Sequence, residues 1–458
     1  MKEEAFEEIE QKIVTFMQKG KIPGLSLSII KDKKVIYNKG FGNRDLAKNL
    51  PVTPDTLFGI GSCTKVFTCL AIMQLAEQGK LSIEDPVSKH IPLKIGLPDK
   101  PIKIKHLMSH SSGLPNLGTA KVLITRHAPI EETWIPFASK DDFYTFINGA
   151  QDEIADEPGK RYFYFNSGFT MLGEIVEAVS GIKYEEYVKE YLLKPLKMER
   201  STFLESEFSK DTDKMTAYIV EGDTPIEKTH PFDQFIYAAG GLLSSVVEMS
   251  NFLLMLLNGG EFEGKRIISS EALNEMFSIQ IESPVNYFGR SGYGFGLAIS
   301  EDFLGQKIVS HGGSTALSSA QFSFIPELGL GIVTEANVGN GMGLIIGQVV
   351  LSLLMGKNPE KEFPLFSIQA KFEKLTGEYT TYKGLEKVKI YIDNGILIGE
   401  TSFRDVTSKF VLIPVDPKVE DYNFYIYNLG NKLPIHFEIN EKDQINLFVE
   451  RNCFHKVK

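Results

Sequence analysis

Cysteine is scarce in this sequence, and its scarcity excludes two kinds of protein. The chain has 458 residues and only three cysteines, Cys63, Cys69 and Cys453. Three cysteines cannot form the disulfide framework of a small secreted domain. None of them has a neighbour at the spacing of a zinc site. We therefore expect a protein of a reducing compartment, with no structural metal.

Long apolar runs are missing as well, which argues against a membrane protein. No window reaches the roughly 20 apolar residues that a bilayer-spanning helix needs. Residues 1–19 are too charged for a signal peptide, and Phe6, Ile9, Ile13 and Phe16 recur at helical spacing. This segment is predicted to be an amphipathic helix. The protein is accordingly expected in the cytoplasm, with no membrane partner.

Clusters of positive charge are also absent. The formal net charge is −10 at pH 7, and no basic stripe interrupts the sequence. Proteins that bind nucleic acid carry such a stripe to neutralise phosphates. We therefore exclude nucleic acid as the main partner. The hydrophobic content of 43% is ordinary for a globular chain with a large core.

A change of composition divides the chain in two. The stretch 356–362, Gly-Lys-Asn-Pro-Glu-Lys-Glu, is the best candidate linker. Residues 1–356 are predicted to form one domain and residues 365–458 a second. The second has short alternating strands, a hairpin turn at Asp393-Asn394-Gly395 and no long helix. It is predicted to be a small antiparallel β-barrel without a catalytic constellation.

The first domain mixes strands and helices, which predicts an α+β fold with an antiparallel sheet of hairpins flanked by helices. The predicted strands are 25–30, 34–37, 293–299, 309–314, 320–325 and 330–334. The predicted helices are 63–78, 169–179, 184–193, 244–257 and 341–354. Residues 122–137, which include His127 and Trp134, are predicted to be an irregular insertion or a lid.

Ser62 and Lys65 are the first candidate catalytic pair. The sequence Phe-Gly-Ile-Gly precedes Ser62, and an apolar helix follows it. The spacing of three residues places Lys65 one turn later on the same helix face. A serine hydroxyl needs a base to become a nucleophile, and a lysine serves only when it is neutral. The positive end of the helix opposes protonation of Lys65.

The Ser-x-x-Lys spacing is not diagnostic by itself. Ser28 and Lys31 share it, but they lie in a predicted strand, where alternation places them on opposite faces. The pair at 62 and 65 therefore depends on its glycine-rich approach, its helix and its partners elsewhere.

A tyrosine and an asparagine supply the first of those partners. Tyr164 and Asn166 lie two residues apart, in a loop just ahead of a predicted helix. A tyrosine near a lysine can be held as phenolate or pass a proton to a leaving group.

The second partner is a glycine-rich strand edge at 311–314. His311 is followed by two glycines and then Ser314. Missing side chains at Gly312 and Gly313 allow a substrate backbone to approach and pair with the strand. The backbone N–H groups of Ser62 and Ser314 are then expected to face a developing oxyanion.

Each candidate also has a purely structural explanation. Ser62 and Lys65 are alternatively a helix cap and a solvated lysine. Tyr164 is alternatively a half-buried tyrosine, and His311 a structural histidine in a glycine turn.

Four further residues attract attention with less support. His106 and His110, four residues apart, suggest a metal pair, but no third ligand lies near them in the sequence. Hydrogen-bonded packing is the preferred explanation for both. Asn116 and Trp134 are candidates for substrate contacts.

Taken together, the three stretches resemble the motifs of the serine β-lactamase and D,D-peptidase superfamily: Ser-x-x-Lys, Tyr-x-Asn and Lys/His-x-Gly. Residues 107–114 are similar to its Leu-Leu-x-His-x-Ser-Gly-Leu segment, and residues 158–168 to its Pro-Gly…Tyr-Ser-Asn-x-Gly segment. Within the superfamily the chain most resembles the class C β-lactamase-like branch, in particular archaeal CubicO-type self-compartmentalising peptidases. The similarity covers roughly residues 5–355, and its motifs are jointly specific.

The resemblance implies a role for each motif residue. Ser62 is the nucleophile, Lys65 its base and Tyr164 the partner in proton transfer. Asn166 contacts a substrate amide, and His311 replaces the usual lysine. Gly313 and Ser314 bind substrate through the strand edge. No metal or cofactor is implied.

Two positions depart from the family pattern. Phe165 occupies the middle of Tyr-x-Asn, where serine or alanine is common, and Cys63 follows the nucleophile. Neither touches the reacting atoms by motif logic, but either can change the size of the pocket.

The same resemblance implies a function and an assembly. We expect a β-lactamase/penicillin-binding-protein-like fold followed by a lipocalin-like barrel that covers the site or mediates assembly. The expected activity is that of a serine peptidase acting through an acyl-enzyme on small peptides, some with D-residues. Relatives form closed homo-oligomers, so an octamer-type assembly is expected. An esterase on the same scaffold is the alternative, and a binding or sensor protein that acylates and stalls is a third reading.

Overall fold

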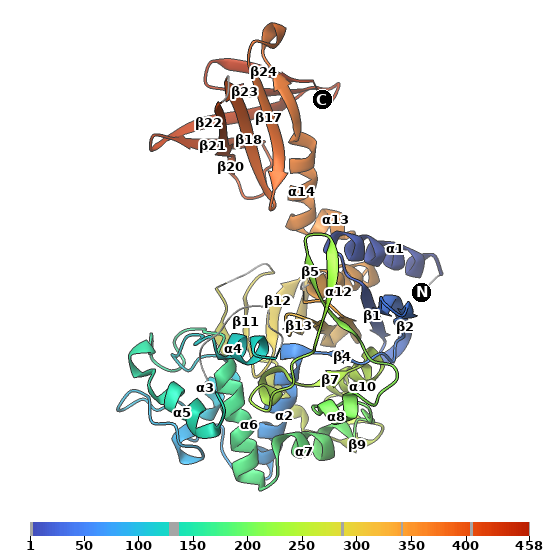
Figure 1. The fold of residues 1–458 in the computed structure, drawn as a ribbon, viewed down its shortest axis with the longest axis vertical. Helices are drawn as coiled ribbons and strands as arrows, with labels where there is room; N and C mark the ends of the chain where they lie inside the picture. Colours follow the sequence, from blue (N-terminus) through green and yellow to red (C-terminus); the bar gives the residue numbers. More distant parts are fainter. Residues whose placement is uncertain (1–2, 128–136, 285–287, 340–341, 404–405, 458) are drawn as a thin grey trace. The chain divides into compact units, whose positions relative to one another are not determined.

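The chain forms two compact units, Met1–Met355 and Gly356–Lys458 (Figure 1). The computed structural model describes residues 3–127, 137–284, 288–339, 342–403 and 406–457. Each unit has its own sheet and its own hydrophobic core. The expected α+β class followed by an antiparallel barrel is confirmed.

The described residues of the first unit build a sheet of nine antiparallel strands, in the order β10-β11-β12-β13-β14-β15-β1-β2-β3. Its strands are β1 Gly24–Lys31, β2 Lys34–Asp45, β3 Leu50–Pro51, β10 Ile281–Glu282, β11 Ser291–Tyr293, β12 Ala298–Phe303, β13 Gln306–Ser314, β14 Ser319–Ile325 and β15 Leu330–Ala336. Short two-stranded pairs are β4 Phe58–Gly59 with β7 Leu243–Ser244, β5 Ala217–Glu221 with β6 Thr224–Lys228, and β8 Glu261–Phe262 with β9 Lys265–Arg266.

Helices cover both faces of this sheet. Gly331 of β15 faces Leu253 of α10 (Val246–Leu257), whereas the next residue, Ile332, faces Gly347 of α12 (Met342–Leu354). Successive side chains of a strand point to opposite faces. The central strands β14 and β15 are therefore buried along their whole length. Helix α1 (Glu3–Gly20) packs beside α12, as expected for an amphipathic N-terminal helix.

The helices beside the sheet (Figure 1) carry Ser62, Lys65 and Asn166, whereas the candidates at 311–314 belong to β13. The helices there are α2 Thr64–Glu77, α3 Ile104–Met108, α4 Thr119–Thr125, α5 Lys140–Asn148, α6 Asn166–Ser180, α7 Tyr184–Val188, α8 Glu205–Phe208, α9 Tyr237–Gly240 and α11 Ser270–Met276. Helix α2 packs against α6, α7 and α9. Its residues 64–75 are all buried, because the helix is apolar around its whole circumference.

Two predictions for the first unit were wrong in part. The segment 122–137 was expected to be irregular, but Thr119–Thr125 forms α4, whose β-branched residues obscure a helical pattern. The rest of that segment from 128 to 136 lies outside the described residues. The expected strand 293–299 is interrupted, because Gly296 adopts a φ of +72° and turns the chain against Lys65 and Cys69 of α2.

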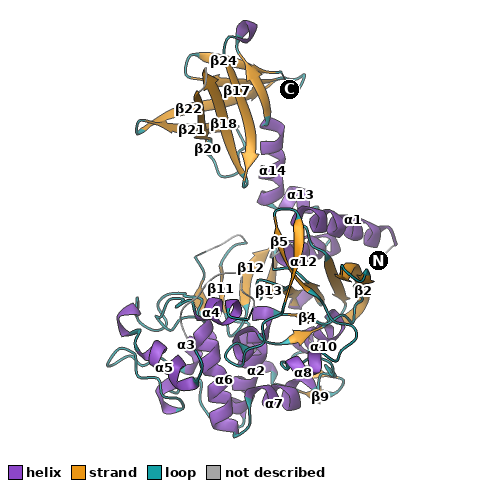
Figure 2. Cartoon of the chain, in the orientation of Figure 1, coloured by secondary structure: helices purple, strands orange, loops and turns teal. Residues whose placement is uncertain are grey.

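The described part of the second unit is a nearly closed antiparallel barrel in the order β19-β18-β17-β16-β24-β23-β22-β21-β20 (Figure 2). Its strands are β16 Gly377–Thr380, β17 Lys387–Asp393, β18 Ile396–Phe403, β19 Val406–Val411, β20 Ile413–Pro414, β21 Asn423–Asn428, β22 Asn431–Ile439, β23 Ile445–Val449 and β24 Asn452–Lys456. Buried side chains such as Tyr379, Phe424 and Phe437 fill the interior. The barrel is therefore a packed core.

The prediction that this half has no long helix was wrong. Residues Pro359–Glu362 form α13, and Pro364–Leu375 form the 12-residue helix α14. Proline is favoured at the first position of a helix, so these prolines begin helices where a linker was expected. Phe372 and Leu375 of α14 are buried in the barrel core, with Ile368 packed beside them. This burial stabilises the helix.

Within the described residues, no helix is both long enough and apolar enough to cross a membrane.

Candidate active site

Ser62 lies at the start of a buried helix, where the chain passes close to the sheet. The 3₁₀ turn Gly61–Cys63 leads directly into α2, and the Ser62 side chain is half-buried. Gly61 has a φ of +52°, and a Cβ there would lie 2.5 Å from the backbone nitrogen of Ser314. Only glycine fits this position, because it tolerates both the conformation and the contact.

Lys65 is fully buried and surrounded by neutral partners. Its Nζ lies 3.0 Å from Ser62 Oγ, 2.8 Å from Asn166 Oδ1 and 2.6 Å from the carbonyl oxygen of Ala239. The exposed fraction of the side chain is 0%. A neutral amine has two N–H donors and one lone pair. The two obligate acceptors take the donors, which leaves the lone pair for the hydroxyl proton of Ser62.

The electrostatics favour that neutral form. Burial lowers the pKa of Lys65 to about 7, from an ordinary value of 10.5. Burial also lowers the pKa of two nearby histidines. Burial, with the positive charge of Lys65 as a second cause, lowers the pKa of His311 to about 3 and that of His110 well below its usual range. Burial thus favours the free-base form of Lys65 near neutral pH.

Tyr164 joins this pair from the segment before α6. Its ring centroid lies 5.0 Å from Lys65 Nζ. Burial raises the pKa of the Tyr164 phenol, and a hydrogen bond with Ser62 acts in the opposite direction. The phenol is therefore a proton donor at neutral pH and is in reach of the Ser62 hydroxyl.

His110 fixes the Tyr-x-Asn segment in place. The backbone N–H of Phe165 donates to His110 Nδ1 at 3.0 Å, and that of Phe163 donates to the His110 carbonyl oxygen at 2.8 Å. The His110 and Tyr164 ring centroids are 4.1 Å apart. His110 thus positions both catalytic neighbours of Phe165, a role that the sequence analysis did not assign.

The strand edge at 312–314 packs directly on the Ser62 turn. A Cβ on Gly313 would lie 1.9 Å from the carbonyl oxygen of Ile60 and 2.7 Å from the backbone nitrogen of Ser62. The two backbones are therefore in contact, with Ser314 next to Gly61. The backbone nitrogens of Ser62 and Ser314 therefore lie close to one another, where the turn meets the strand edge.

Gly313→Ala tests this contact. The added methyl group has to displace the backbone of Ile60, so we expect at least a tenfold loss of kcat/KM and a lower melting temperature. Gly305→Ala is a control for handling and expression, because nothing lies within 4 Å of its added Cβ, although its φ of +87° makes some loss of stability expected. Steady-state kinetics and a thermal melt measure both effects. Full activity of Gly313→Ala would contradict the described packing.

Both ring nitrogens of His311 have partners other than Ser62. Its Nδ1 lies 2.7 Å from the carbonyl oxygen of Gly312, and its Nε2 lies 2.7 Å from the Tyr293 hydroxyl. A carbonyl only accepts, so Nδ1 carries the proton and Nε2 accepts from Tyr293. The side chain is 4% exposed and does not line the cavity beside Ser62. This geometry suits a residue that orients the Gly312 peptide.

The remaining candidates do not converge on Ser62. His106 Nδ1 accepts from the backbone of Lys103, so it is not paired with His110 as a metal ligand. Asn116 accepts from the backbone of Gly118 in an exposed turn. Trp134 lies outside the described residues. Among the residues that the structure describes, no group of three His, Cys, Asp or Glu side chains is suited to a metal ion.

His127 belongs to an ion-pair cluster beside the site. Its Nε2 lies 3.0 Å from Asp233 Oδ2, and the same carboxylate accepts from Arg126. Arg126 also donates to the carbonyl oxygen of Phe137. The Asp233 side chain is 2% exposed. This cluster ties the end of α4 to the segment that carries Phe235.

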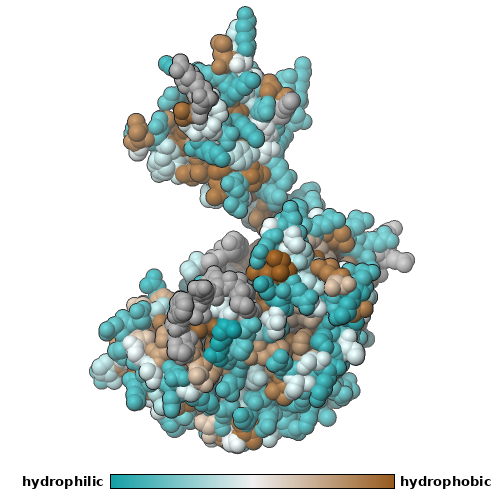
Figure 3. Space-filling view, in the orientation of Figure 1, coloured by the Kyte–Doolittle hydropathy of each residue, from teal (hydrophilic) through white to brown (hydrophobic). Residues whose placement is uncertain are grey.

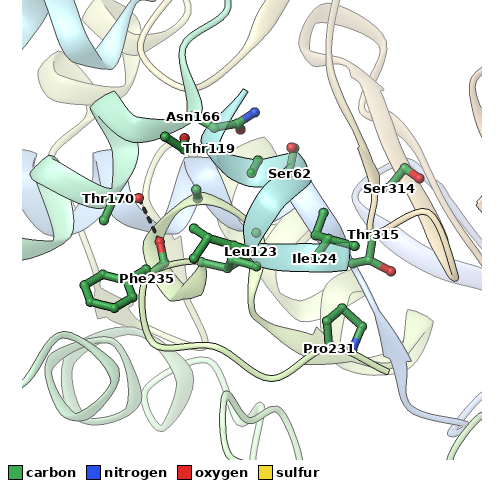
Figure 4. A pocket seen from close by; sticks show the side chains of 14 residues that line it. Ser62, Thr119, Leu123, Ile124, Asn166, Thr170, Pro231, Phe235, Ser314 and Thr315 are labelled. Atoms are coloured by element: carbon green, nitrogen blue, oxygen red, sulfur yellow. Dashed lines mark hydrogen bonds between the residues drawn. The ribbon is translucent and has the colours of Figure 1, made fainter. Parts of the chain in front are cut away.

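A cavity opens beside Ser62 and Asn166 (Figure 4). Its volume is about 120 Å³. Residues of α4 and of the segment 231–240 form its walls, and Ser314 and Thr315 form its edge at the sheet. Ser62, Asn166 and Ser314 thus line this cavity, whereas Lys65 and Tyr164 bond to Ser62 but are not among the lining residues.

This fold, with a serine and a buried lysine in contact at the start of α2, is that of the β-lactamase family. The chain belongs to this family, whose profile matches residues 9–344. Residues 359–455 match a second profile, described as the Pab87 octamerisation domain.

Two relatives illustrate the similarity. A solved structure of an octameric penicillin-binding protein homologue from Pyrococcus abyssi is 37% identical, with a TM-score of 0.90, and covers 98% of this chain and 100% of its own. Protein flp from Staphylococcus aureus (strain MW2) is 28% identical over 337 residues, which is 73% of this chain. The match spans only 63% of the length of protein flp.

Proposed function

We propose that the protein is a serine peptidase that forms an acyl-enzyme on small peptides, including peptides with D-residues. One observation carries the chemistry: Lys65 is completely buried, 3.0 Å from Ser62 Oγ, among neutral partners. A lysine in this environment is a base at neutral pH.

The first half-reaction forms an ester on Ser62. The Ser62 oxygen attacks the carbonyl carbon while Lys65 Nζ takes its proton. The N–H groups of Ser62 and Ser314 stabilise the oxyanion. The bond to the leaving amine then breaks, the amine takes a proton from Tyr164, and Lys65 returns its proton to the phenolate.

The second half-reaction releases the acyl group. A water molecule attacks the ester carbon and gives its proton to the same Lys65 and Tyr164 system. The ester bond breaks, and the Ser62 oxygen takes that proton back. Every proton that leaves the serine or the water is thus returned or carried away with a product.

The substrate class is supported by similarity and by the size of the site. The Pyrococcus abyssi relative is described as a penicillin-binding protein homologue, and the motifs resemble those of a superfamily that includes D,D-peptidases. Residues 311–314 offer a backbone edge with which an extended peptide can pair. The cavity of about 120 Å³ admits one side chain, which favours short peptides.

Labelling with a fluorophosphonate tests the proposed chemistry. The reagent is expected to modify Ser62 alone, as shown by mass spectrometry of the digested protein. Absence of labelling at Ser62 would overturn the proposal. If Ser62 is labelled, but the unlabelled enzyme releases only one burst of product from a substrate without steady turnover, the protein acylates and stalls.

Tyr164→Phe separates a peptidase from an esterase. An amide leaving group needs a proton, whereas a para-nitrophenolate does not. We expect the variant to lose about 10²-fold or more in kcat/KM on peptides and less than about tenfold on para-nitrophenyl esters. Tyr162→Phe is the matched control, because Tyr162 packs near Tyr164 without bonding to Ser62. An enzyme that cleaves esters alone, with no peptide turnover in the wild type, would establish the esterase.

We also propose that the protein forms a homo-oligomer through its second unit. Apolar side chains are exposed on this barrel (Figure 3), among them Tyr382 at 74%, Leu385 at 82% and Leu429 at 98% exposed. Exposed apolar surface marks an interaction site where it is contiguous, and Tyr382 and Leu385 both lie in the connection between β16 and β17. The similarity to an octameric protein favours eight copies. Light scattering at the mass of a single chain would contradict this assembly.

A further inference from the structure

The cavity beside Ser62 has apolar walls. Its apolar lining is contributed by Leu123 and Ile124 of α4 and by Pro231, Phe235, Ile236 and Ala239 (Figure 4). No acidic or basic side chain is among its lining residues in the described part of the chain. A charged substrate group placed here would lose its hydration without gaining a partner.

The hydroxyl groups of the cavity are already engaged by the protein. Thr170 Oγ1 donates to the carbonyl oxygen of Phe235 at 2.7 Å, and Thr119 Oγ1 lies 2.6 Å from Ser167 Oγ. Thr315 Oγ1 lies 2.8 Å from Ser318 Oγ. Each of these hydroxyl groups therefore already has a partner within the protein, which leaves less for a polar substrate side chain to bond.

The charged residues nearby neutralise each other outside the cavity. Asp233 accepts hydrogen bonds from Arg126 and His127, and its side chain is almost completely buried. This cluster holds the two walls together. It does not offer a free charge to the substrate.

The size of the cavity sets an upper limit on the group it binds. Its volume is about 120 Å³. An apolar protein cavity of about 150 Å³ holds one benzene molecule. A branched aliphatic side chain of three or four carbons fits the smaller space, whereas an indole ring does not.

The position of the cavity tells which side of the scissile bond it serves. It is lined by Ser62, Ser314 and Asn166, but Tyr164 is not among its lining residues. Tyr164 is the group that protonates the leaving amine in the proposed mechanism. A side chain in this cavity therefore belongs to the acyl residue, which stays attached to Ser62.

We infer that this cavity selects substrates whose acyl residue carries an uncharged aliphatic side chain of the size of valine or leucine. The inference rests on the proposed function and adds the substrate class to it. The selection arises from apolar walls, engaged hydroxyl groups and a limited volume.

A series of Gly-Xaa-para-nitroanilides tests the inference, with Xaa as Ala, Val, Leu, Phe, Trp, Lys and Glu, each in the L and the D form. Within the reactive stereochemical series, kcat/KM is expected to be at least tenfold higher for Val or Leu than for Ala, Trp, Lys or Glu. A preference for Lys, Glu or Trp would overturn the inference, as would equal values for all side chains.

Ala120→Leu tests the role of the cavity volume. Ala120 lines the cavity from α4, so the larger side chain fills part of it. We expect kcat/KM for the Leu substrate to fall at least tenfold and that for the Ala substrate to stay within threefold. Lys121→Leu, at the next and exposed position of α4, introduces the same side chain outside the cavity and is the control. Leu123→Ala provides the opposite change, with an optimum shifted to Phe. An unchanged preference in both Ala120→Leu and Leu123→Ala would overturn the inference.

The failure of this inference differs from the failure of the proposed function. If Ser62 is labelled but the enzyme prefers charged substrate side chains, or shows no preference among side chains, only the cavity assignment is overturned. No labelling of Ser62 overturns the proposed function, and the assignment with it.

Discussion

Ser62→Ala is expected to reduce turnover by about 10⁴-fold or more and to abolish fluorophosphonate labelling. The substitution removes the attacking oxygen, and removal of a nucleophile from a serine enzyme has effects of this size. Ser62 is half-buried at a turn whose shape is set by Gly61, so the fold is expected to persist. Steady-state kinetics and labelling measure both losses, and a thermal melt checks the fold.

The chain contains its own matched control. Ser28 precedes Lys31 with the same spacing, but it lies in β1 and its Oγ is 2.6 Å from Ser250 Oγ. Ser28→Ala therefore removes a buried hydrogen bond, at a cost of about 1 kcal/mol in stability, and leaves the chemistry intact. If Ser62→Ala kept full activity, or if Ser28→Ala lost it in a folded protein, the assignment of the nucleophile would be wrong.

Lys65→Met is expected to lower kcat/KM and the labelling rate by about 10³-fold or more. Methionine has a similar length and shape but no lone pair on nitrogen, so the base is lost. The substitution leaves Asn166 Oδ1 and the Ala239 carbonyl oxygen without their donor, at a cost of about 1–3 kcal/mol in the free energy of unfolding. Removing the buried amine also removes the cost of its desolvation, which raises the free energy of unfolding. The variant should therefore fold.

Lys31→Met is the corresponding control, because Lys31 lies at the end of β1 on the first sheet. Activity of Lys65→Met within tenfold of the wild type, with Lys31→Met unchanged, would show that another group is the base. A circular dichroism melt separates this outcome from loss of the fold.

The helix after Ser62 could be predicted because its evidence is local. Glycines at 59 and 61, a small turn and an uninterrupted apolar run are visible in the sequence and specify a buried helix. The same holds for the end of α6 (Asn166–Ser180), because Gly181 follows it in the left-handed conformation. Its start was predicted three residues too late, because no side chain caps the helix at Phe165.

The acceptors of Lys65 could not be predicted in full, because one of them is a main-chain carbonyl. Ala239 contributes its carbonyl oxygen from α9, and no side chain marks that role. The small residues of the run Ala238-Ala239-Gly240-Gly241 are the one sign of this role in the sequence. The structure shows why they are small, because a Cβ on Gly240 would lie 3.3 Å from the Gly61 backbone.

The orientation of His311 also depends on the fold. Its partner Tyr293 is two strands away in the sheet, with Ala298 of β12 directly paired to Tyr293. A motif that names one histidine cannot specify this contact, because the contact depends on strand register.

Helix α14 is different, since its signals were present in the sequence. Pro364 stands at its first position, and Ile368, Phe372 and Leu375 form one apolar stripe. The helix was not predicted, because the alternating strands that follow it led to the prediction of a barrel without a long helix. Helix α4 had weaker signals, because Thr119, Val122, Ile124 and Thr125 are β-branched, and packing against the site decides its conformation.

The pH dependence of Ser62 labelling tests the central claim most directly, because it reports the protonation of Lys65 in the free enzyme. The second-order rate constant for a neutral fluorophosphonate is measured from pH 5 to 10 on the wild-type protein. Only the neutral amine accepts the serine proton, so the rate falls tenfold per pH unit at low pH and reaches a plateau at high pH. We predict a midpoint near the lowered Lys65 pKa of about 7. A rate that keeps rising toward the ordinary lysine value of 10.5, or one that does not change with pH, would contradict the account.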